Sequence, residues 1–254
     1  MRVFVLPQNP PYGQFLDITG KEYHYLARVR RVKVGEQFPG TDGRGGSWRC
    51  TVLEIGPSSL RLQLEEAPDS SLSQQPSICL IQCLPKGKKM DLIVRQAAET
   101  GLRCLIPVFS RNSQVRYSDD REAERKLERW QRIARQALQQ SGAAAAPIIE
   151  SPRELQAVLS DLDDRADGEV RLFFHQDREG SDTLHACLSK IGKIITLVVG
   201  PEGGLAQNEI DLLRSKSFVP ITLGYTVLRA ETAALYALAA VQTVIYERKA
   251  WEPT

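Results

Sequence analysis

Two short glycine-bearing segments contain the residues whose types and spacing point most directly to chemistry. The first reads GPEGGL, from Gly200 to Leu205, and it follows the β-branched run KIITLVV at 193–199. The second reads LGYTVLRAETA, from Leu223 to Ala233. Glycine tolerates positive φ and lets a ligand approach main-chain N–H and C=O groups closely. The pair therefore predicts a pocket of main-chain groups, although GPEGGL alone also fits a tight turn before a helix around 208–216.

The charge of these two segments limits the ligand that they fit. Arg229 is the only Lys or Arg in either of them, which suits a neutral or zwitterionic adenosine compound better than a triphosphate. Neither G-x-G-x-x-G nor G-x-x-x-x-G-K-[ST] follows a predicted strand, so the common phosphate-binding loops are missing. No G-x-S-x-G turn or Ser-His-Asp order indicates a hydrolase. We expect an adenosine-containing ligand held mainly by the backbone.

Basic residues gather at two other places in the chain. The segment LPKGKKM at 84–90 places Lys86, Lys88 and Lys89 at the start of a predicted helix, where free amides already carry partial positive charge. Only an anion would offset this crowding, which predicts a phosphate-contacting loop, with plain surface lysines as the alternative. The stretch KEYHYLARVRRVK at 21–33 is strongly basic and predicts contact with a polyanion, unless it is only a solvated helix face.

The elements that position these residues fall into two groups. Before the polar, proline-containing segment at 67–77, short β-type stretches surround a single helix, which predicts a small β-barrel. That helix opens with Thr19-Gly20-Lys21-Glu22, which matches a capping box. GRGG at 43–46 lies between two predicted strands and indicates a hairpin. We place a domain boundary near residue 73, giving domains of 1–72 and 73–254.

After this boundary, predicted strands alternate with predicted helices, which indicates an α/β fold with a mainly parallel sheet. Strands are expected at 78–84, 104–110, 170–175, 193–200 and 218–224. Helices are expected from about 88 to 101, from Asp120 to Gln140, after a Ser151-Pro152 cap, and from Glu231 to Arg248. Since ligands of such sheets collect at the carboxyl ends of the strands, both glycine-bearing segments fall where a site is expected.

Bulk properties exclude several classes of protein. The apolar runs are shorter than the roughly 20 residues of a membrane helix, and the N-terminus lacks a signal-peptide pattern, so we expect a soluble cytoplasmic protein. The five cysteines are an odd number in mostly apolar surroundings and indicate buried thiols rather than disulfides. The three histidines show no metal-ligand spacing with them. We therefore expect no membrane association and no metal.

The motifs together resemble a known family. GPEGGL, LGYTVLRAETA, PKGKKMDLIVRQAAETG and ERWQRIARQALQQS carry the resemblance, and HYLARVRRVKVGE extends the match into the basic helix. They resemble the SPOUT superfamily of trefoil-knotted methyltransferases, and within it the bacterial family that methylates ring nitrogen 3 of a uridine in 16S ribosomal RNA. The resemblance covers nearly the whole chain. It implies a PUA-like RNA-binding barrel at 1–72 and a SPOUT domain, with S-adenosylmethionine bound in a knot, at 73–254.

The resemblance also implies roles for individual residues. Arg229 would stabilise negative charge on the uracil, and Glu231 would orient Arg229 or accept the proton, unless it is only a favourable acidic residue in the first turn of a helix. RNA phosphate would meet Arg2, Arg28, Arg30, Arg31 and Lys86. The methyl donor would be contacted by Gly200, Pro201, Glu202, Gly203, Leu223, Gly224, Leu228, Arg229, Ala230 and Thr232.

The expected partners are 16S ribosomal RNA in the small ribosomal subunit and a second copy of the chain. Small residues of the last helix, among them Ala233, Ala237 and Ala240, would permit close approach of another helix, with a core-facing helix of the same chain as the alternative. The chain departs from the family at Ala143-Ala144-Ala145-Ala146, where arginines are usual. Two other functions stay open: a SPOUT methyltransferase acting on another RNA, and a non-catalytic RNA-binding assembly factor.

Overall fold

A computed structural model describes most of the 254 residues. The described residues are 4–6, 15–41, 47–66, 76–141, 145–162, 168–176, 182–189 and 192–251. Two compact units make up the chain. The first comprises 1–74 together with 135–146, and the second comprises 75–134 and 147–254.

The N-terminal unit is built on a five-stranded sheet with the order β1-β3-β4-β5-β2. Its strands are β1 (Phe4–Val5), β2 (Phe15–Thr19), β3 (Gln37–Thr41), β4 (Ser47–Ile55) and β5 (Ser59–Glu66). All pairings are antiparallel except that of β1 with β3. The pairing of Thr41 with Ser47 confirms that 42–46 joins two antiparallel strands, although the GRGG residues themselves lie outside the described part of the chain.

The helical segment of this unit begins differently from the predicted capping box. It consists of α1 (Gly20–His24) continued by a π-helix at Tyr25–Arg30. The Thr19 side chain makes no capping hydrogen bond, because Gly20 has φ +64° and turns the chain away from a regular first turn. Tyr23 instead anchors the segment, since its hydroxyl donates to the carbonyl oxygens of Gly56 and Pro57 at 2.8 and 2.9 Å.

The C-terminal unit contains a seven-stranded sheet whose pairings are all parallel. The order is β12-β10-β11-β6-β7-β8, and β9 also pairs with β7. The bounds are β6 (Ser77–Cys83), β7 (Cys104–Phe109), β8 (Ile148–Ile149), β9 (Arg153–Glu154), β10 (Glu169–Phe174), β11 (Ile194–Val199) and β12 (Val219–Ile221). The predicted fold class, a small β unit followed by a parallel α/β unit, is confirmed.

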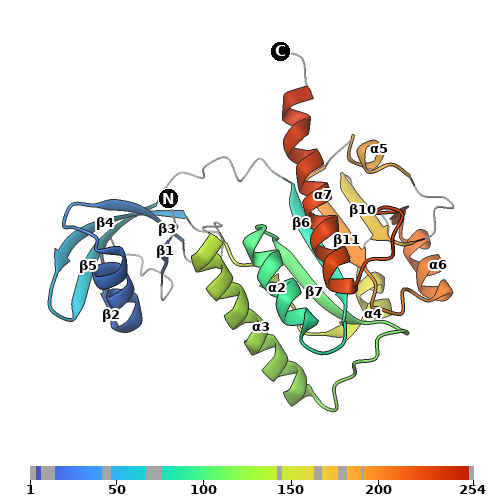
Figure 1. Cartoon of the computed structure of the whole chain (residues 1–254), viewed down its shortest axis with the longest axis horizontal. Helices are drawn as coiled ribbons and strands as arrows, with labels where there is room; N and C mark the ends of the chain where they lie inside the picture. The colour runs from blue at the N-terminus through green and yellow to red at the C-terminus, as the bar shows by residue number, and fades with distance from the viewer. Residues whose placement is uncertain are drawn as a thin grey trace. The chain divides into compact units, whose positions relative to one another are not determined.

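Helices cover both faces of this sheet (Figure 1). The helices that follow β6 in the chain are α2 (Lys89–Glu99), α3 (Asp120–Ser141), α4 (Leu155–Ser160), α5 (Leu184–Leu188), α6 (Gln207–Ser215) and α7 (Ala230–Trp251), and residues 135–141 of α3 belong to the first unit. α4 and α6 bury side chains against one face, where they meet Ile81, Phe173 and Val198. On the other face α7 packs against α2, α5 and β11. Burial of this apolar surface is the main stabilising contribution to the fold.

Two details of the sequence interpretation are wrong. The helix predicted after Ser151-Pro152 begins only at Leu155, because Arg153 and Glu154 first pair with β7 as strand β9. In α7, Ala237, Leu238 and Val241 are buried inside the chain itself, so of the small residues named for contact with a second copy only Ala233 and Ala240 stay partly exposed.

The remaining bulk expectations concern cysteines, membrane spans and metals. All five cysteines are free thiols, and burial raises the pKa of Cys50 and of Cys83 to about 12, which keeps them unreactive. Among the described helices, none combines the length and apolar character of a membrane span. The same part of the chain contains no group of three or more His, Cys, Asp or Glu side chains placed to hold a metal ion.

Candidate active site

Three neighbouring parallel strands end together and create the site. β10 lies between β11 and β12, and Phe174 is in register with Val199 on one side and Ile221 on the other. The segment 200–204, here called the first glycine loop, and the segment 222–229, the second glycine loop, therefore leave the same edge of the sheet. Sites in parallel sheets form at such an edge, where loops diverge from adjacent strands.

Between the two loops lies a pocket of about 570 Å³. Eight of the residues predicted to contact the methyl donor line it: Gly200, Pro201, Glu202, Gly203, Leu223, Gly224, Leu228 and Ala230. Arg229 and Thr232 are not among the lining residues. His175 and Gln176 also line the pocket, and the sequence interpretation missed them. They follow β10 directly, so the expectation that ligands bind at the carboxyl ends of parallel strands could have identified them.

The backbone of the first glycine loop is held by hydrogen bonds from a distant segment. Asn112 Nδ2 donates to the carbonyl oxygens of Gly203 and Gly204 at 3.1 and 3.2 Å. Gly204 has φ +69°, and its N–H donates to the Pro201 carbonyl oxygen at 2.9 Å. A Cβ at Gly203 would lie 3.1 Å from Asn112 Cβ. Glycine at 203 therefore allows a close approach to Asn112, and glycine at 204 suits the positive φ of the backbone.

A buried carboxylate fixes the segment that follows this loop. Glu209, at the start of α6, is 9% exposed. Its Oε1 accepts from Arg111 N and its Oε2 accepts from Ala206 N, both at 2.8 Å. One carboxylate thus joins the loop after β7 to the N-terminus of α6. Nothing in the sequence pattern signals this contact, because 98 positions separate Arg111 from Glu209.

The two residues predicted to be catalytic lie at the start of α7 in different settings. Arg229 is exposed, and within the described part of the chain its guanidinium makes no hydrogen bond or ion pair. The Glu231 side chain is only 14% exposed, and its Oε2 lies 3.5 Å from Lys89 Nζ. The charged group beside Glu231 is therefore Lys89, and the predicted contact with Arg229 is not formed.

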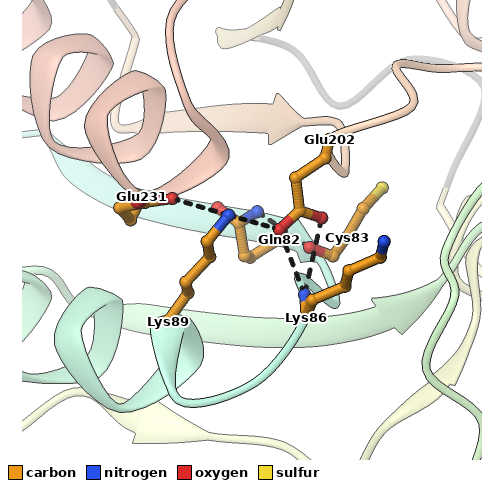
Figure 2. Close-up of polar contacts among 6 residues, drawn as sticks. All are labelled: Gln82, Cys83, Lys86, Lys89, Glu202 and Glu231. Atoms are coloured by element: carbon orange, nitrogen blue, oxygen red, sulfur yellow. Dashed lines mark hydrogen bonds and ion pairs between the residues drawn. The ribbon is translucent and has the colours of Figure 1, made fainter.

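The lysine-rich start of α2 has its anion within the same chain. Lys89 Nζ lies 2.6 Å from Glu202 Oε1, and Lys86 N donates to Oε1 and Oε2 of Glu202 at 3.2 and 3.4 Å (Figure 2). The hydrogen bond to Glu202 raises the pKa of Lys89. Burial acts to raise the pKa of Glu202, but hydrogen bonds from Lys89 and from backbone amides hold it below its ordinary value. Glu202 thus offsets the charge of Lys89, whereas the side chains of Lys86 and Lys88 stay exposed.

The residues predicted to bind RNA differ in exposure and are divided between the two units. Arg28 and Arg31 are exposed on the N-terminal unit, and the side chain of Lys86 is exposed on the C-terminal unit. Arg30 is partly buried, with Cζ 4.4 Å from the centroid of the Phe38 ring. Arg2 lies outside the described residues. Of the four alanines at 143–146, Ala145 and Ala146 are described and partly buried.

Comparison with known proteins matches both units. A model described as RNA methyltransferase domain covers 73–242, and a model described as RNA methyltransferase PUA domain covers 18–65. The chain is 30% identical to the ribosomal RNA small subunit methyltransferase E of Bacillus subtilis, with 88% of each chain covered. It is 33% identical to the protein of that name from Synechocystis, with 90% of this chain and 73% of the relative covered.

A solved structure agrees with these matches. The Neisseria gonorrhoeae ribosomal RNA small subunit methyltransferase E, bound to S-adenosyl methionine, is 27% identical and has a TM-score of 0.76. The match covers 96% of this chain and 98% of that one. The PUA-like identity of the N-terminal unit is thus confirmed. The chain belongs to the RNA methyltransferase family that includes the ribosomal RNA small subunit methyltransferase E proteins.

Proposed function

We propose that the chain transfers a methyl group from S-adenosylmethionine to ring nitrogen 3 of a uridine in 16S ribosomal RNA of the small ribosomal subunit. The observation that carries this proposal is the pocket between the two glycine loops, whose predicted residues meet from separate strand ends. The Neisseria relative with the same fold is bound to S-adenosyl methionine. We further propose that residues 1–72 hold RNA and that 73–254 hold the methyl donor.

The pocket fits the donor in size and in chemistry. Its volume of about 570 Å³ lies within the roughly 300–1,000 Å³ of ligand pockets. Glycines at 200, 203, 204 and 224 leave main-chain groups accessible, which suits the amide-like edge of an adenine. Glu202 lines the pocket while its carboxylate contacts Lys89, so little uncompensated charge is directed at the ligand.

When bound, S-adenosylmethionine supplies an electrophilic methyl group on a sulfonium. The residues of this chain must then place the uracil and stabilise the negative charge that appears on its carbonyl oxygens as N3 loses its proton. Arg229 is the proposed group for this task, because it stands between the pocket-lining residues Leu228 and Ala230 with an exposed guanidinium that pairs with no described residue. A guanidinium stays protonated at working pH and presents a planar fork of donors to an oxygen anion.

Glu231 is the proposed acceptor of the N3 proton. It lies two positions after Arg229, and its Oε2 makes no hydrogen bond among the described residues. A carboxylate can accept a proton directly or through one water molecule. Its Oε2 is buried while the side chain as a whole is 14% exposed, so a water molecule that carries the proton would reach the carboxylate through the rest of the side chain.

We also propose that the chain forms a homodimer through the exposed face of α7. Tyr236 and Tyr246 are 51% and 58% exposed, and Thr232, Ala239 and Thr243 continue this face at spacings of three and four residues. Aromatic side chains are enriched in the cores of protein interfaces. The proposed location is the cytoplasm, where ribosomal subunits are assembled, and no metal is assigned a role.

Mapping methylated nucleosides in ribosomal RNA from cells with and without this gene tests the proposed reaction. Loss of one N3-methyluridine from 16S RNA, restored by the wild-type gene, is expected. A lost modification in another RNA would identify a different substrate. Purified protein that binds the donor but leaves every RNA unmethylated would instead indicate a non-catalytic assembly factor.

A further inference from the structure

Lys89 stands between two carboxylates that come from different walls of the pocket. Its Nζ is 2.6 Å from Glu202 Oε1 and 3.5 Å from Glu231 Oε2 (Figure 2). Glu202 belongs to the first glycine loop, and Glu231 follows Ala230, where the second glycine loop enters α7. Lys89 itself begins α2, which follows β6. The Lys89 ammonium therefore links the start of α2, the first glycine loop and the start of α7. Lys89 lies 113 positions before Glu202 in the sequence.

Lys89, Glu202 and Glu231 together carry two negative charges and one positive charge. The three side chains are 31%, 28% and 14% exposed, so two carboxylates are partly removed from water with one cation between them. Glu231 Oε2 has no hydrogen-bond partner in the part of the chain that the structure describes, which leaves Lys89 as its nearest compensating group there. Without the ammonium, two like charges would remain close together in a poorly solvated place, and their repulsion would push the loops apart.

A second contact ties the same strand ends together beneath this cluster. Gln82 is fully buried, and its Nε2 donates to the carbonyl oxygens of Cys83 and Val199 at 2.9 and 3.4 Å. Val199 is the last residue of β11, directly before the first glycine loop. β6 thus fixes the base of this loop through Gln82, while α2 fixes its tip through Lys89.

We infer that Lys89 is a positioning residue that holds both walls of the methyl-donor pocket at the separation the donor requires. The inference rests on the proposed function, since it assigns Lys89 to the site where the donor is proposed to bind. Lys89 is not among the residues that line the pocket, and no contact with the uracil is proposed for it. It acts through Glu202, which lines the pocket, and through the start of α7.

Donor binding and RNA binding respond differently if this inference is correct. Lys89→Met should raise the donor dissociation constant and the donor KM by roughly tenfold, as expected for removal of one hydrogen bond between charged groups. The KM for the ribosomal subunit should stay within about twofold of wild type, a change too small to represent a missing hydrogen bond. Because the variant weakens assembly of the pocket, kcat at saturating donor should fall less than kcat/KM for the donor.

The experiment compares three variants of the full chain by calorimetry with S-adenosylmethionine and by steady-state methylation of small ribosomal subunits. Lys89→Arg should recover most of the donor affinity, because it keeps a cation between the two carboxylates. Lys88→Met is the matched control, since Lys88 is exposed on the same turn and its side chain forms no ion pair with either carboxylate. It should bind S-adenosylmethionine with wild-type affinity and show a wild-type KM for the donor, whatever it does to RNA binding. Melting temperatures of all variants without ligand show whether each is folded.

A double mutant gives a second, independent readout. Glu202→Gln removes the carboxylate charge but keeps an acceptor for Lys86 N, and it should raise the donor KM by itself. In the Lys89→Met, Glu202→Gln protein the second change should cost much less than it does alone, because its partner is already absent. Strictly additive effects would show that the two residues act separately and would overturn the inference.

Other outcomes separate this inference from the proposed function. Wild-type protein that binds no donor contradicts the proposed function itself. Wild-type protein that binds the donor while Lys89→Met binds it equally well contradicts only the role of Lys89. If Lys89→Met weakens RNA binding and lowers its salt slope by about 0.7–0.9 while the donor affinity is unchanged, Lys89 binds phosphate instead, and the inference is overturned.

Discussion

Asn112 holds the carbonyl oxygen of Gly203 through its Nδ2 at 3.1 Å, although 91 positions separate the two residues. The loop after β7 thereby fixes the backbone that lines the proposed donor pocket. Asn112→Ala should weaken binding of S-adenosylmethionine by roughly two- to tenfold, as expected for the removal of one or two neutral hydrogen bonds. Calorimetry measures this directly, and unchanged affinity would show that the loop keeps its shape without Asn112.

Gly203→Val should abolish donor binding, for a reason that the sequence alone did not reveal. The positive φ values in the two glycine loops belong to Gly204 and Gly224, whereas a side chain at 203 would crowd Asn112 Cβ, which lies 3.1 Å from the position of the added Cβ. The matched test is a double-mutant cycle. Gly203→Ala should weaken donor binding in the wild-type chain and should weaken it much less in an Asn112→Gly chain, where the crowded Cβ is absent. An equal effect of Gly203→Ala in both chains would rule out this steric explanation.

Arg229→Ala should lose methyl transfer far more than it loses donor or RNA binding. A hydrogen bond to a charged group contributes about 1.5–3 kcal/mol, equivalent to roughly 10- to 150-fold in rate if it forms in the transition state. Single-turnover methylation of small subunits gives the rate. Arg229→Lys should recover part of it, and Arg214→Ala, which removes an exposed arginine from α6, serves as the control. A folded, donor-binding Arg229→Ala protein with undiminished rate would exclude this residue from the mechanism.

The two exposed arginines of the N-terminal unit should provide RNA affinity, whereas Arg30 should provide stability. Arg28→Ala combined with Arg31→Asn should lower the salt slope of RNA binding by about 0.7–0.9 for each phosphate that the variant no longer binds. Asparagine is chosen at 31 because Arg31 has φ 56°, which asparagine tolerates. Arg30→Ala should instead lower the melting temperature, since it removes the guanidinium from the Phe38 ring. Reduced donor affinity in the double variant would contradict separate roles for the two units.

Dimerisation through α7 predicts a mass near twice 28.4 kDa in solution. Tyr236→Glu places a charge on the exposed face of the helix and should produce a monomer without unfolding it. Val34→Glu changes an equally exposed apolar residue of the N-terminal unit and should leave the mass unchanged. Light scattering at micromolar concentration distinguishes these cases, and a monomeric wild-type protein would refute the interface.

Acid should weaken the contact between α2 and α3. Arg129 Nη2 lies 2.7 Å from Asp91 Oδ2, and this hydrogen bond holds the pKa of Asp91 below its ordinary 3.8. A depressed carboxyl pKa stabilises the fold above the unfolded value, and the contribution is lost as pH falls through the folded value. Melting temperatures of wild type and Asp91→Asn should therefore differ at neutral pH and converge below about pH 3.8. A constant difference across this range would show that the ion pair contributes nothing.

The sequence predicted the alternating elements because their periodicity is strong. Strand β11 and helix α2 appear within a few residues of their expected positions, since one is a continuous apolar run and the other repeats apolar residues at helical spacing. The start of α4 was missed because two residues that directly follow an apparent helix cap pair with β7 instead. Pairing with a strand so much earlier in the chain leaves no local signal.

The candidate site shows the same contrast between local patterns, which are visible in the sequence, and long-range contacts, which are not. Glycines at strand ends are visible in sequence, so the pocket walls were predicted, and many of the named residues line one pocket. The groups that brace those walls were not visible. The anion expected near Lys89 is Glu202, which lies 113 positions away, and only the strand order brings the two together. Charge crowding at the helix start predicted an anion and favoured an external phosphate, whereas the group beside Lys89 is a carboxylate of the same chain.

The strand order also determines when the protein can become active during its synthesis. β6 is completed early, yet its neighbour β11 comes so late that Gln82 reaches Val199 across 117 positions, and the pocket is finished only by residues at the start of α7. A nascent chain that has not yet released α7 from the ribosome lacks one wall of the pocket. Folding dominated by such distant pairings is slow compared with folding of local hairpins. The N-terminal sheet, whose strands all lie within 4–66, can form before the strands and loops of the pocket are complete.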